Sequence, residues 1–273
     1  MYLTKTNRRG RGFTMNWDYE DFKKAILELI NINLSHYKER QMKRRINSLI
    51  NRNNYRGYYE YYQALLKDKE LLNQFIDYLT INVSEFYRNP GQWEILKKEI
   101  IPKLLDGKSK QLKIWSAACS TGEEPYTIVM ILREYLPYDK IHILATDIDR
   151  EAIRKAKEGL YVEKSLESLP QIYIKNYFTK EGNTYKIDAK IKSCVEFRHH
   201  NLLTDDFPKD CDLIVCRNVM IYFTEEAKIM LYKKFYDALQ NDGILFVGST
   251  EQIIFPQRYG FKSIHTFFYK KDI

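Results

Sequence analysis

Two acidic residues near the ends of apolar runs could bind a nucleoside. Glu124 follows the apolar run 113–118 and a tight turn, after which a helical pattern begins. Asp147 ends the next apolar run, residues 141–147. A strand, a tight turn and a helix in this order form the place where open α/β sheets hold a nucleoside, and an acid ending the second strand can accept both ribose hydroxyls.

The turn before Glu124 favours a ligand without phosphate groups. Gly122 is its only glycine, so the turn lacks the Gly-x-Gly-x-x-Gly pattern that lets the backbone approach a pyrophosphate. It also lacks the Gly-x-x-x-x-Gly-Lys-Ser/Thr loop that cradles a triphosphate. S-adenosylmethionine is the commonest nucleoside cofactor without phosphates on this architecture. We therefore expect this cofactor, with Gly122 and Glu124 among its contacts.

Ser120 and Glu123 match a second pattern, which is purely structural. A serine followed three residues later by a glutamate is typical of a capping box, in which each side chain bonds the backbone N–H of the other residue. This pattern predicts that Glu123 caps the helix. Glu124 has no such duty, so it is the better candidate for a cofactor contact. Pro125 in the first helical turn supports the helix start.

Three further polar clusters fall where this architecture places its ligand, near the ends of strands. They are Asn201-Leu202, Arg217-Asn218 with Tyr222, and the segment 82–88 that precedes the first strand. Asn201 and Leu202 are suited to contacting an adenine edge. Taken singly, each polar residue has a simpler explanation, because such residues also cap helices and satisfy loops.

The bulk composition is that of a soluble globular protein. The 273 residues can form one large domain or two smaller ones, and 44% are hydrophobic while 29% are charged. No apolar run approaches the roughly 20 residues of a membrane span, and the basic N-terminal residues lack the apolar core of a secretory signal. The four cysteines show no paired zinc spacing, so we expect no metal and reduced, buried thiols in a cytoplasmic protein.

The N-terminal part of the chain has helical patterning. We interpret residues 1–15 as a disordered leader and residues 16–88 as an all-helical domain with its linker. The prediction rests on three apolar stripes at helical spacing. The stripes are Phe22, Ile26, Leu29 and Ile30; Met42, Ile46, Leu49 and Ile50; and Leu71, Leu72, Phe75, Ile76 and Leu79.

A basic face lies on the second of these helical patterns. Arg40, Lys43 and Arg44 share one side, opposite the stripe that contains Met42 and Ile46. The common explanation for such a face is solvated surface. The alternative is a docking surface for an acidic helical partner.

We interpret residues 89–273 as a catalytic domain of the α/β class. A helix over residues 93–105 leads into alternating strand and helix patterns, which predict a doubly wound, mostly parallel sheet. Strands are expected near residues 112–118, 141–147, 194–200, 212–216 and 243–248, with a helix over 224–239 and a terminal strand or hairpin at 261–270.

The alternation stops between about residues 160 and 195. Glu181-Gly182-Asn183 lies between two short strand patterns, which is typical of a hairpin. We therefore expect a small antiparallel β insertion on the edge of the main sheet.

Taken together, these motifs resemble those of chemotaxis receptor methyltransferases, the CheR family. The likeness runs in order from about Trp17 to the C-terminus through residues 80–88, 115–126, 145–149, 201–203 and 216–223. The resemblance implies a class I, Rossmann-like methyltransferase that transfers a methyl group from S-adenosylmethionine to glutamate side chains on the cytoplasmic helical bundle of chemoreceptors. It implies cofactor contacts at Asn82, Ser84, Arg88, Glu124, Asp147, Asn201, Leu202, Arg217 and Asn218. It also places Arg88 and Tyr222 beside the methyl-transfer site.

Elementary chemistry agrees with these roles. A glutamate carboxylate, with a reference pKa of about 4.3, is already ionised at neutral pH and needs no general base. Methyl transfer is an in-line displacement, so positioning supplies much of the rate. Arg88 could orient the incoming carboxylate as a fork without holding it tightly, and the Tyr222 hydroxyl could orient the carboxylate or the sulfonium.

The resemblance also bears on the partner. Glutamates of an acidic receptor bundle would suit the basic face of Arg40, Lys43 and Arg44. Some relatives grip a receptor-tail peptide through a longer glycine-rich hairpin loop, whereas this hairpin has the compact loop 180–184. This departure leaves tail binding open, and we expect the insertion to help dock the receptor body and the enzyme to be a monomer.

Two other functions remain open from the sequence. The net charge of +8 also suits a nucleic-acid methyltransferase, but the Asn/Asp-Pro-Pro-Tyr/Phe motif for base amino groups is replaced by Cys216-Arg217-Asn218. Cytosine C5 chemistry would need a cysteine nucleophile, for which Cys216 is the candidate. The second alternative is a cofactor-binding receptor module without catalysis, although both Arg88 and Tyr222 are retained.

Overall fold

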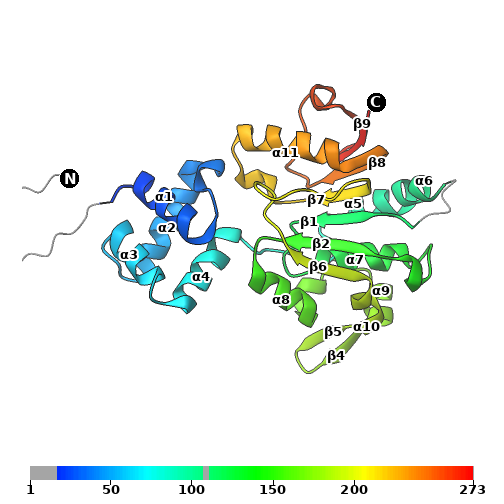
Figure 1. Ribbon diagram of the computed structural model, residues 1–273. Coiled ribbons are helices and arrows are strands. Elements are labelled where there is room, and N and C mark those ends of the chain that lie inside the picture. Colours follow the sequence, from blue (N-terminus) through cyan, green and yellow to red (C-terminus); the bar gives the residue numbers. More distant parts are fainter. Residues whose placement is uncertain (1–16, 107–110, 273) are drawn as a thin grey trace, which may run out of the picture. The chain divides into compact units, whose positions relative to one another are not determined.

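The computed structural model describes residues 17–106 and 111–272 and divides the chain into two compact units (Figure 1). Unit 1 is Met1–Phe75 and unit 2 is Ile76–Ile273. The predicted leader at residues 1–15 lies outside the described residues. Within the described part of the chain, no helix is long and apolar enough to cross a bilayer.

Unit 1 consists of helices that bury one face each, as the three apolar stripes predict. They are α1 (Tyr19–Ile30), a 3-10 turn (Leu34–His36), α2 (Glu39–Arg52), α3 (Tyr58–Leu65) and the first part of α4 (Lys69–Thr80). Asp18 and Asp21 form a capping box at the start of α1. Phe22, Tyr61 and Phe75 are fully buried and their rings pack together, with centroids 5.8–6.4 Å apart. These aromatic contacts hold the helical core of unit 1.

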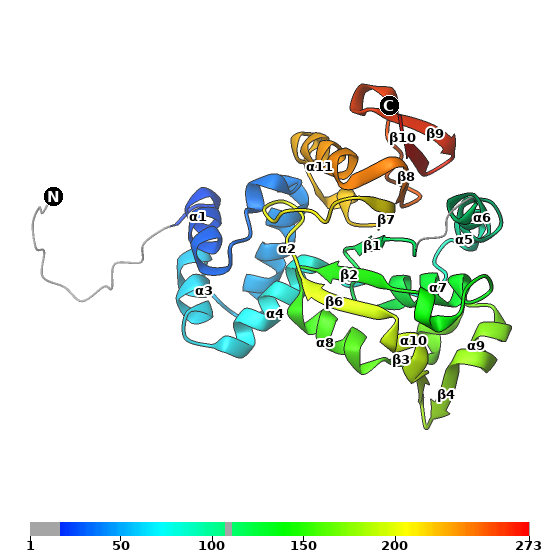
Figure 2. The same cartoon turned by 45° about the vertical axis from the view of Figure 1, so that its right-hand side comes forward.

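Unit 2 is built on a seven-stranded sheet in the order β6-β2-β1-β7-β8-β10-β9 (Figure 2). The strands are β1 (Ile114–Ala117), β2 (Ile143–Asp147), β6 (Val195–His199), β7 (Cys211–Cys216), β8 (Leu239–Val247), β9 (Phe261–His265) and β10 (Phe268–Lys271). The pairs from β6 through β8 are parallel, and β10 is antiparallel to both β8 and β9. The predicted doubly wound, mostly parallel sheet is confirmed. Strand order reverses beside β1, which is where such sheets bind their ligands.

Helices precede the first strand, connect strands of the main sheet and lie within the insertion. They are α5 (Pro90–Ile95), α6 (Ile101–Leu105), α7 (Glu123–Leu132), α8 (Arg150–Glu158), α9 (Gln171–Tyr177), α10 (Ala189–Ser193) and α11 (Glu225–Ala238). Helices α7 and α8 both contact β2 and β6, while α11 contacts β8. The α7 helix is buried along its whole length, because it carries apolar residues on every side.

The single helix predicted over residues 93–105 is interrupted. Between α5 and α6 the chain makes a π-helical segment, Leu96–Ile100, in which the Ile101 N–H bonds the Leu96 carbonyl. Pro102 follows one residue after this segment. Proline lacks an N–H and its ring clashes with the carbonyl four residues earlier, so a wider turn relieves the conflict.

The insertion is a separate three-stranded antiparallel sheet in the order β3-β5-β4. Its strands are β3 (Leu160–Val162), β4 (Phe178–Glu181) and β5 (Thr184–Ile187). The predicted hairpin is therefore confirmed, whereas β3 was not expected, because three residues are too few to show a periodic pattern. Both views place this small sheet beyond β6, away from β9, and it forms no part of the main sheet (Figures 1 and 2).

Candidate functional site

The turn after β1 folds against the end of β2. The Ala118 and Cys119 N–H groups both donate to the Thr146 carbonyl, at 2.8 and 2.9 Å. The Ser120 N–H donates to Oδ2 of Asp147 at 2.7 Å. Ala118 and Ser120 have φ values of 78° and 47°. Residues other than glycine adopt such positive values only when their surroundings impose them. The strand ends of β1 and β2 thus form one fixed edge.

Gly122 is required by the backbone and by packing. Its φ is +94°, and an added Cβ would lie 2.9 Å from the Ala156 Cβ and 3.1 Å from the Tyr126 ring. Gly122 is also the N-cap of α7, where no side chain caps the helix. The predicted capping box of Ser120 and Glu123 is therefore wrong, because Ser120 lies two residues before the N-cap. A cofactor contact at Gly122 stays a prediction.

Asp147 is buried and retains acceptor capacity for a ribose. Its Oδ1 accepts the Asp149 N–H at 2.9 Å and its Oδ2 accepts the Ser120 N–H. Burial raises the pKa of Asp147 to about 6, although these backbone hydrogen bonds oppose the shift. Each carboxylate oxygen can accept two hydrogen bonds, so the carboxylate keeps acceptor capacity beside its backbone donors.

Glu124 lies inside the domain, against Arg217. Its Oε1 accepts the Ser116 hydroxyl at 2.9 Å, and its Oε2 lies 3.6 Å from Nη1 of Arg217. Burial raises the pKa of Glu124 to about 7, and the guanidinium opposes this shift. Glu123 next to it is also buried and bonds Thr121 and Ser84. Glu123 therefore does not have the predicted capping role, while a cofactor contact at Glu124 stays a prediction.

Arg217 holds the backbone of Arg88 at the end of β7. Its guanidinium lies 4.9 Å from the Trp93 ring centroid and 4.8 Å from that of Phe246. Its Nη2 donates to the Arg88 carbonyl at 2.7 Å and to Oε1 of Gln92 at 2.8 Å. Its Nε is buried and has no hydrogen-bond partner among the described residues. A buried orphan donor is costly, so this atom suits an acceptor from a ligand, as predicted for a cofactor contact.

The two predicted catalytic residues lie on segments that this arginine connects. Arg88 is half-buried, and its Nη1 donates to the Val83 carbonyl at 3.0 Å. Tyr222 ends a 3-10 turn (Met220–Tyr222) that follows Arg217 closely, and its side chain is also partly exposed. Both side chains are therefore partly accessible, and the hydrogen bond from Arg217 to the Arg88 carbonyl joins the two segments.

Glu251 is a site residue that sequence reasoning missed. It is buried, and its carboxylate accepts N–H groups of Asn218 at 2.6 Å, Gly248 at 2.8 Å and Ile221 at 3.3 Å. It thereby fixes the loop that carries Asn218, whose φ is +61°, and Tyr222. The only sequence signal is an acid shortly after a buried strand, which is too common to single out.

The remaining predicted cofactor residues have internal partners. Asn82 accepts the Ser120 hydroxyl at 3.1 Å, and Ser120 in turn bonds Asp147 through its N–H, so Asn82 lies close to Asp147. Asn201 accepts the Leu203 N–H and lies just beyond His199, which pairs with Asp147 across β6 and β2. Leu202 is buried, and its carbonyl accepts Nζ of Lys234 at 3.0 Å. The structure thus brings Asn82 and Asp147 together, while the roles of Asn201 and Leu202 toward a cofactor stay predictions.

The basic face of α2 is exposed within unit 1. Arg40, Lys43 and Arg44 line an open depression together with Asn47, Ser48 and Asn51. The stripe on the opposite side, which contains Met42 and Ile46, is buried as predicted. The face therefore presents positive charge to solvent, and its role in docking stays a prediction.

The thiol alternative is not supported. All four cysteines are buried and free. Burial raises the pKa of Cys216 well above its usual value, so the thiolate needed for attack on a base is strongly disfavoured. Cys216 packs at the end of β7 instead.

Comparisons with known proteins identify relatives of this chain. Residues 17–80 match the family model "CheR methyltransferase, all-alpha domain", and residues 82–268 match "CheR methyltransferase, SAM binding domain". A chemotaxis protein methyltransferase of Listeria innocua is 42% identical over 93% of this chain and 97% of its own length. One of Borreliella burgdorferi is 34% identical over 91% and 93% of the two chains. A TehB-like SAM-dependent methyltransferase structure from Corynebacterium glutamicum covers 67% of this chain and 94% of its own, with a TM-score of 0.37 and 17% identity, too weak a likeness to carry an argument.

Proposed function

Because the chain belongs to the CheR methyltransferase family and is an S-adenosylmethionine-dependent methyltransferase, we propose that its acceptors are glutamate carboxylates of chemoreceptors. The products are glutamyl methyl esters on the cytoplasmic helical bundle of the receptor, which serve sensory adaptation. The enzyme acts on this bundle as a monomer in the cytoplasm. The names of the curated relatives, which are chemotaxis methyltransferases, support this assignment.

The residues at the strand ends fit the cofactor. When bound, S-adenosylmethionine supplies a methyl group on a positively charged sulfur. Asp147 would accept the ribose hydroxyls, and the orphan Nε of Arg217 would donate to the carboxylate of the methionine part. Asn201 and Leu202 would contact the adenine, while Asn82, Ser84, Glu124 and Asn218 would complete the pocket.

The acceptor side needs positioning and no proton abstraction. The glutamate carboxylate is ionised at neutral pH, so its oxygen is ready to attack. Arg88 orients this carboxylate, and Tyr222 assists from the loop after β7. The single observation that carries the proposal is the set of contacts that Arg217 makes with Glu124 and with the Arg88 carbonyl. These contacts hold the Arg88 backbone at the same sheet edge as Asp147.

A transfer assay with two acceptors tests the proposal against its rivals. Labelled S-adenosylmethionine is incubated with the enzyme and either receptor cytoplasmic fragments or RNA, and the label is captured on a filter. We expect label on the receptor fragment that is released by mild base, and none on RNA. Label on RNA would support the nucleic-acid alternative, and cofactor binding without transfer would support a non-catalytic module.

Reversing the charge of the α2 face should weaken receptor binding. In the triple variant Arg40→Glu, Lys43→Glu and Arg44→Glu, we expect receptor affinity to fall about tenfold or more at low salt, because attraction to acidic helices becomes repulsion. Cofactor affinity should not change. The measurement is receptor-fragment binding at low and high salt.

The matched control for this face reverses three exposed lysines elsewhere in unit 1, Lys24, Lys67 and Lys69. This control changes the net charge by the same amount. Because the lysines lie away from the α2 face, we expect it to affect receptor binding much less. Equal losses in both variants would mean that only the overall charge matters. Unchanged affinity in the α2 variant would make that face plain solvated surface.

Cofactor affinity should fall in acid. The pKa of Asp147 is raised by burial to about 6, and only the ionised carboxylate accepts two hydroxyl donors fully. Since the cofactor prefers the deprotonated form, its dissociation constant rises as pH falls through 6 and is about tenfold higher at pH 5 than at pH 8. Titration calorimetry with S-adenosylhomocysteine measures this. If S-adenosylhomocysteine binds at pH 5 as tightly as at pH 8 or more tightly, Asp147 does not bind the ribose.

A further inference from the structure

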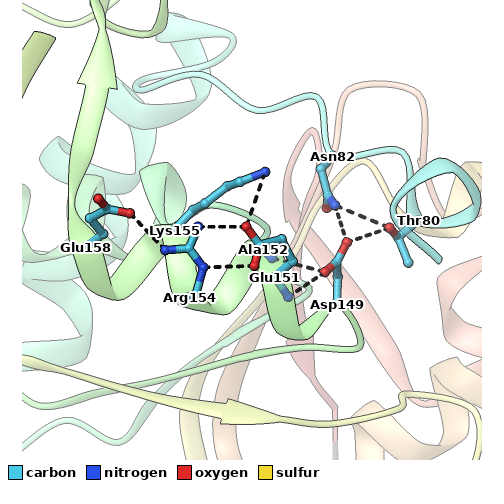
Figure 3. Close-up of polar contacts among 8 residues, drawn as sticks. All are labelled: Thr80, Asn82, Asp149, Glu151, Ala152, Arg154, Lys155 and Glu158. Carbon is cyan, nitrogen blue, oxygen red and sulfur yellow. Dashed lines mark hydrogen bonds and ion pairs between the residues drawn. The ribbon is translucent and has the colours of Figure 1, made fainter. Parts of the chain in front are cut away.

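The two carboxylate oxygens of Asp149 have separate partners (Figure 3). Oδ1 caps helix α8 by accepting the N–H groups of Glu151 at 2.8 Å and Ala152 at 3.0 Å. Oδ2 accepts the Thr80 hydroxyl at 2.8 Å and the Asn82 side-chain amide. Asp149 is only 1% exposed. One buried residue therefore joins the start of α8 to the end of α4, a link that a helix cap alone does not require.

The residue between the two donors is strained. Ile81 has a φ of +48°, which is a genuine outlier for a β-branched side chain. Thr80 and Asn82 flank it on either side and bind the same oxygen of Asp149. Such a conformation persists only where its surroundings over-determine it, and these two hydrogen bonds supply that constraint.

The constraint continues to the cofactor site. The Oδ1 of Asn82 accepts the Ser120 hydroxyl, and the Ser120 N–H donates to Asp147. Asp77 on α4 also faces Asp149, and burial together with that neighbouring charge raises the pKa of Asp77. Two close carboxylates repel each other, so the donors that hold Asp149 must offset this repulsion.

We propose that Asp149 is a positioning residue whose Oδ2 latches residues 80–82 and thereby fixes the segment 82–88 at the active site. It touches neither cofactor nor acceptor and acts through Thr80 and Asn82. Release of the latch lets Ile81 relax to a negative φ, which displaces Asn82 from Ser120. The inference rests on the proposed function for the roles of Asn82 and Arg88.

The substitution Asp149→Ser separates the two roles of this residue. Serine caps helices about as well as aspartate, so the α8 cap remains, while the second oxygen is lost. We expect the affinity for S-adenosylhomocysteine to fall about tenfold, because a charge-assisted hydrogen-bond pair to the cofactor-binding segment is removed. Thr80→Val, which removes one donor, should give a smaller loss, and Thr80→Ser should retain wild-type affinity.

The matched control is Asp188→Ser, because Asp188 caps α10 through the Lys190 N–H and lies on the surface. This control should bind the cofactor product like the wild type. A double-mutant cycle of Asp149→Ser with Asn82→Ala then shows whether the effect runs through Asn82. In the Asn82→Ala background, we expect Asp149→Ser to weaken the affinity for S-adenosylhomocysteine by less than a further twofold.

Amide hydrogen exchange tests the latch in the cofactor-free protein. In Asp149→Ser, residues 81–88 should exchange faster than in the wild type, while the amides of α8 keep their protection. Unchanged exchange of residues 81–88, or fully additive losses in the cycle, would reduce Asp149 to a helix cap. Failure of the wild type to bind the cofactor product would instead count against the proposed function, since the exchange experiment needs no ligand.

Discussion

The variant Arg88→Ala should lose about 100-fold in kcat for receptor methylation while binding the cofactor within about threefold of the wild type. The carboxylate nucleophile needs no activation, so the arginine contributes by orienting it. Misplacement of a nucleophile by about 1 Å can cost this much. The Arg88 backbone is held by Arg217 and Trp93, so truncation of the side chain should leave the local fold intact.

Two comparison variants sharpen this test. Arg88→Lys keeps the charge but loses the planar fork, so we expect an intermediate kcat. Arg198→Ala removes an exposed arginine that pairs with Glu196 on β6, and should behave like the wild type. Steady-state kinetics with the receptor fragment and calorimetry with S-adenosylhomocysteine give the two constants. Weakened cofactor binding with unchanged kcat in Arg88→Ala would assign Arg88 to the cofactor.

The variant Asp147→Ala should lose about 100-fold or more in cofactor affinity. Two hydrogen bonds from ribose hydroxyls to a buried carboxylate would disappear, which corresponds to about 3 kcal/mol. Asp147 also receives the Ser120 and Asp149 N–H groups, so the turn after β1 loses an anchor as well. Asp147→Asn keeps one oxygen acceptor, and we expect it to recover part of the affinity and to reduce the loss of binding in acid, since Glu124 still titrates there.

The control for this prediction lies before the same strand. Asp139 is exposed in the 3-10 turn Tyr138–Lys140, which precedes β2, so Asp139→Ala should leave cofactor binding unchanged. Calorimetry of each variant should be accompanied by a thermal melt, because a lost anchor also lowers stability. Wild-type affinity in a folded Asp147→Ala protein would show that the ribose is bound elsewhere.

The strands of the main sheet could be predicted because the burial of a strand shows in the composition of its own residues. The residues of β1 and β7 are buried on both faces, so each appears in the sequence as a continuous apolar run. The helical stripe of α2 is equally local, with Met42 and Ile46 one turn apart. The order of the strands within the sheet was not predicted, because spacing alone does not determine it.

The bonds that assemble the site could not be predicted, since their partners are far apart in the sequence. Arg217 meets the Arg88 carbonyl, and Asp149 meets Asn82, across long stretches of chain. The capping box at Ser120 failed for a related reason: α7 begins later, after the N-cap Gly122, and Asp147 competes with Glu123 for the Ser120 N–H. A sequence pattern cannot show such competition, because it contains only neighbouring residues.

The most direct test of the proposed function is to identify the atoms that receive the methyl group. The enzyme is incubated with labelled S-adenosylmethionine and receptor cytoplasmic fragments, and the modified residues are mapped by mass spectrometry. We predict methyl esters on glutamate side chains of the receptor helices, which mild base removes and which Arg88→Ala nearly abolishes. Base-stable methylation of other side chains, or no modification by an enzyme that binds the cofactor, would contradict it.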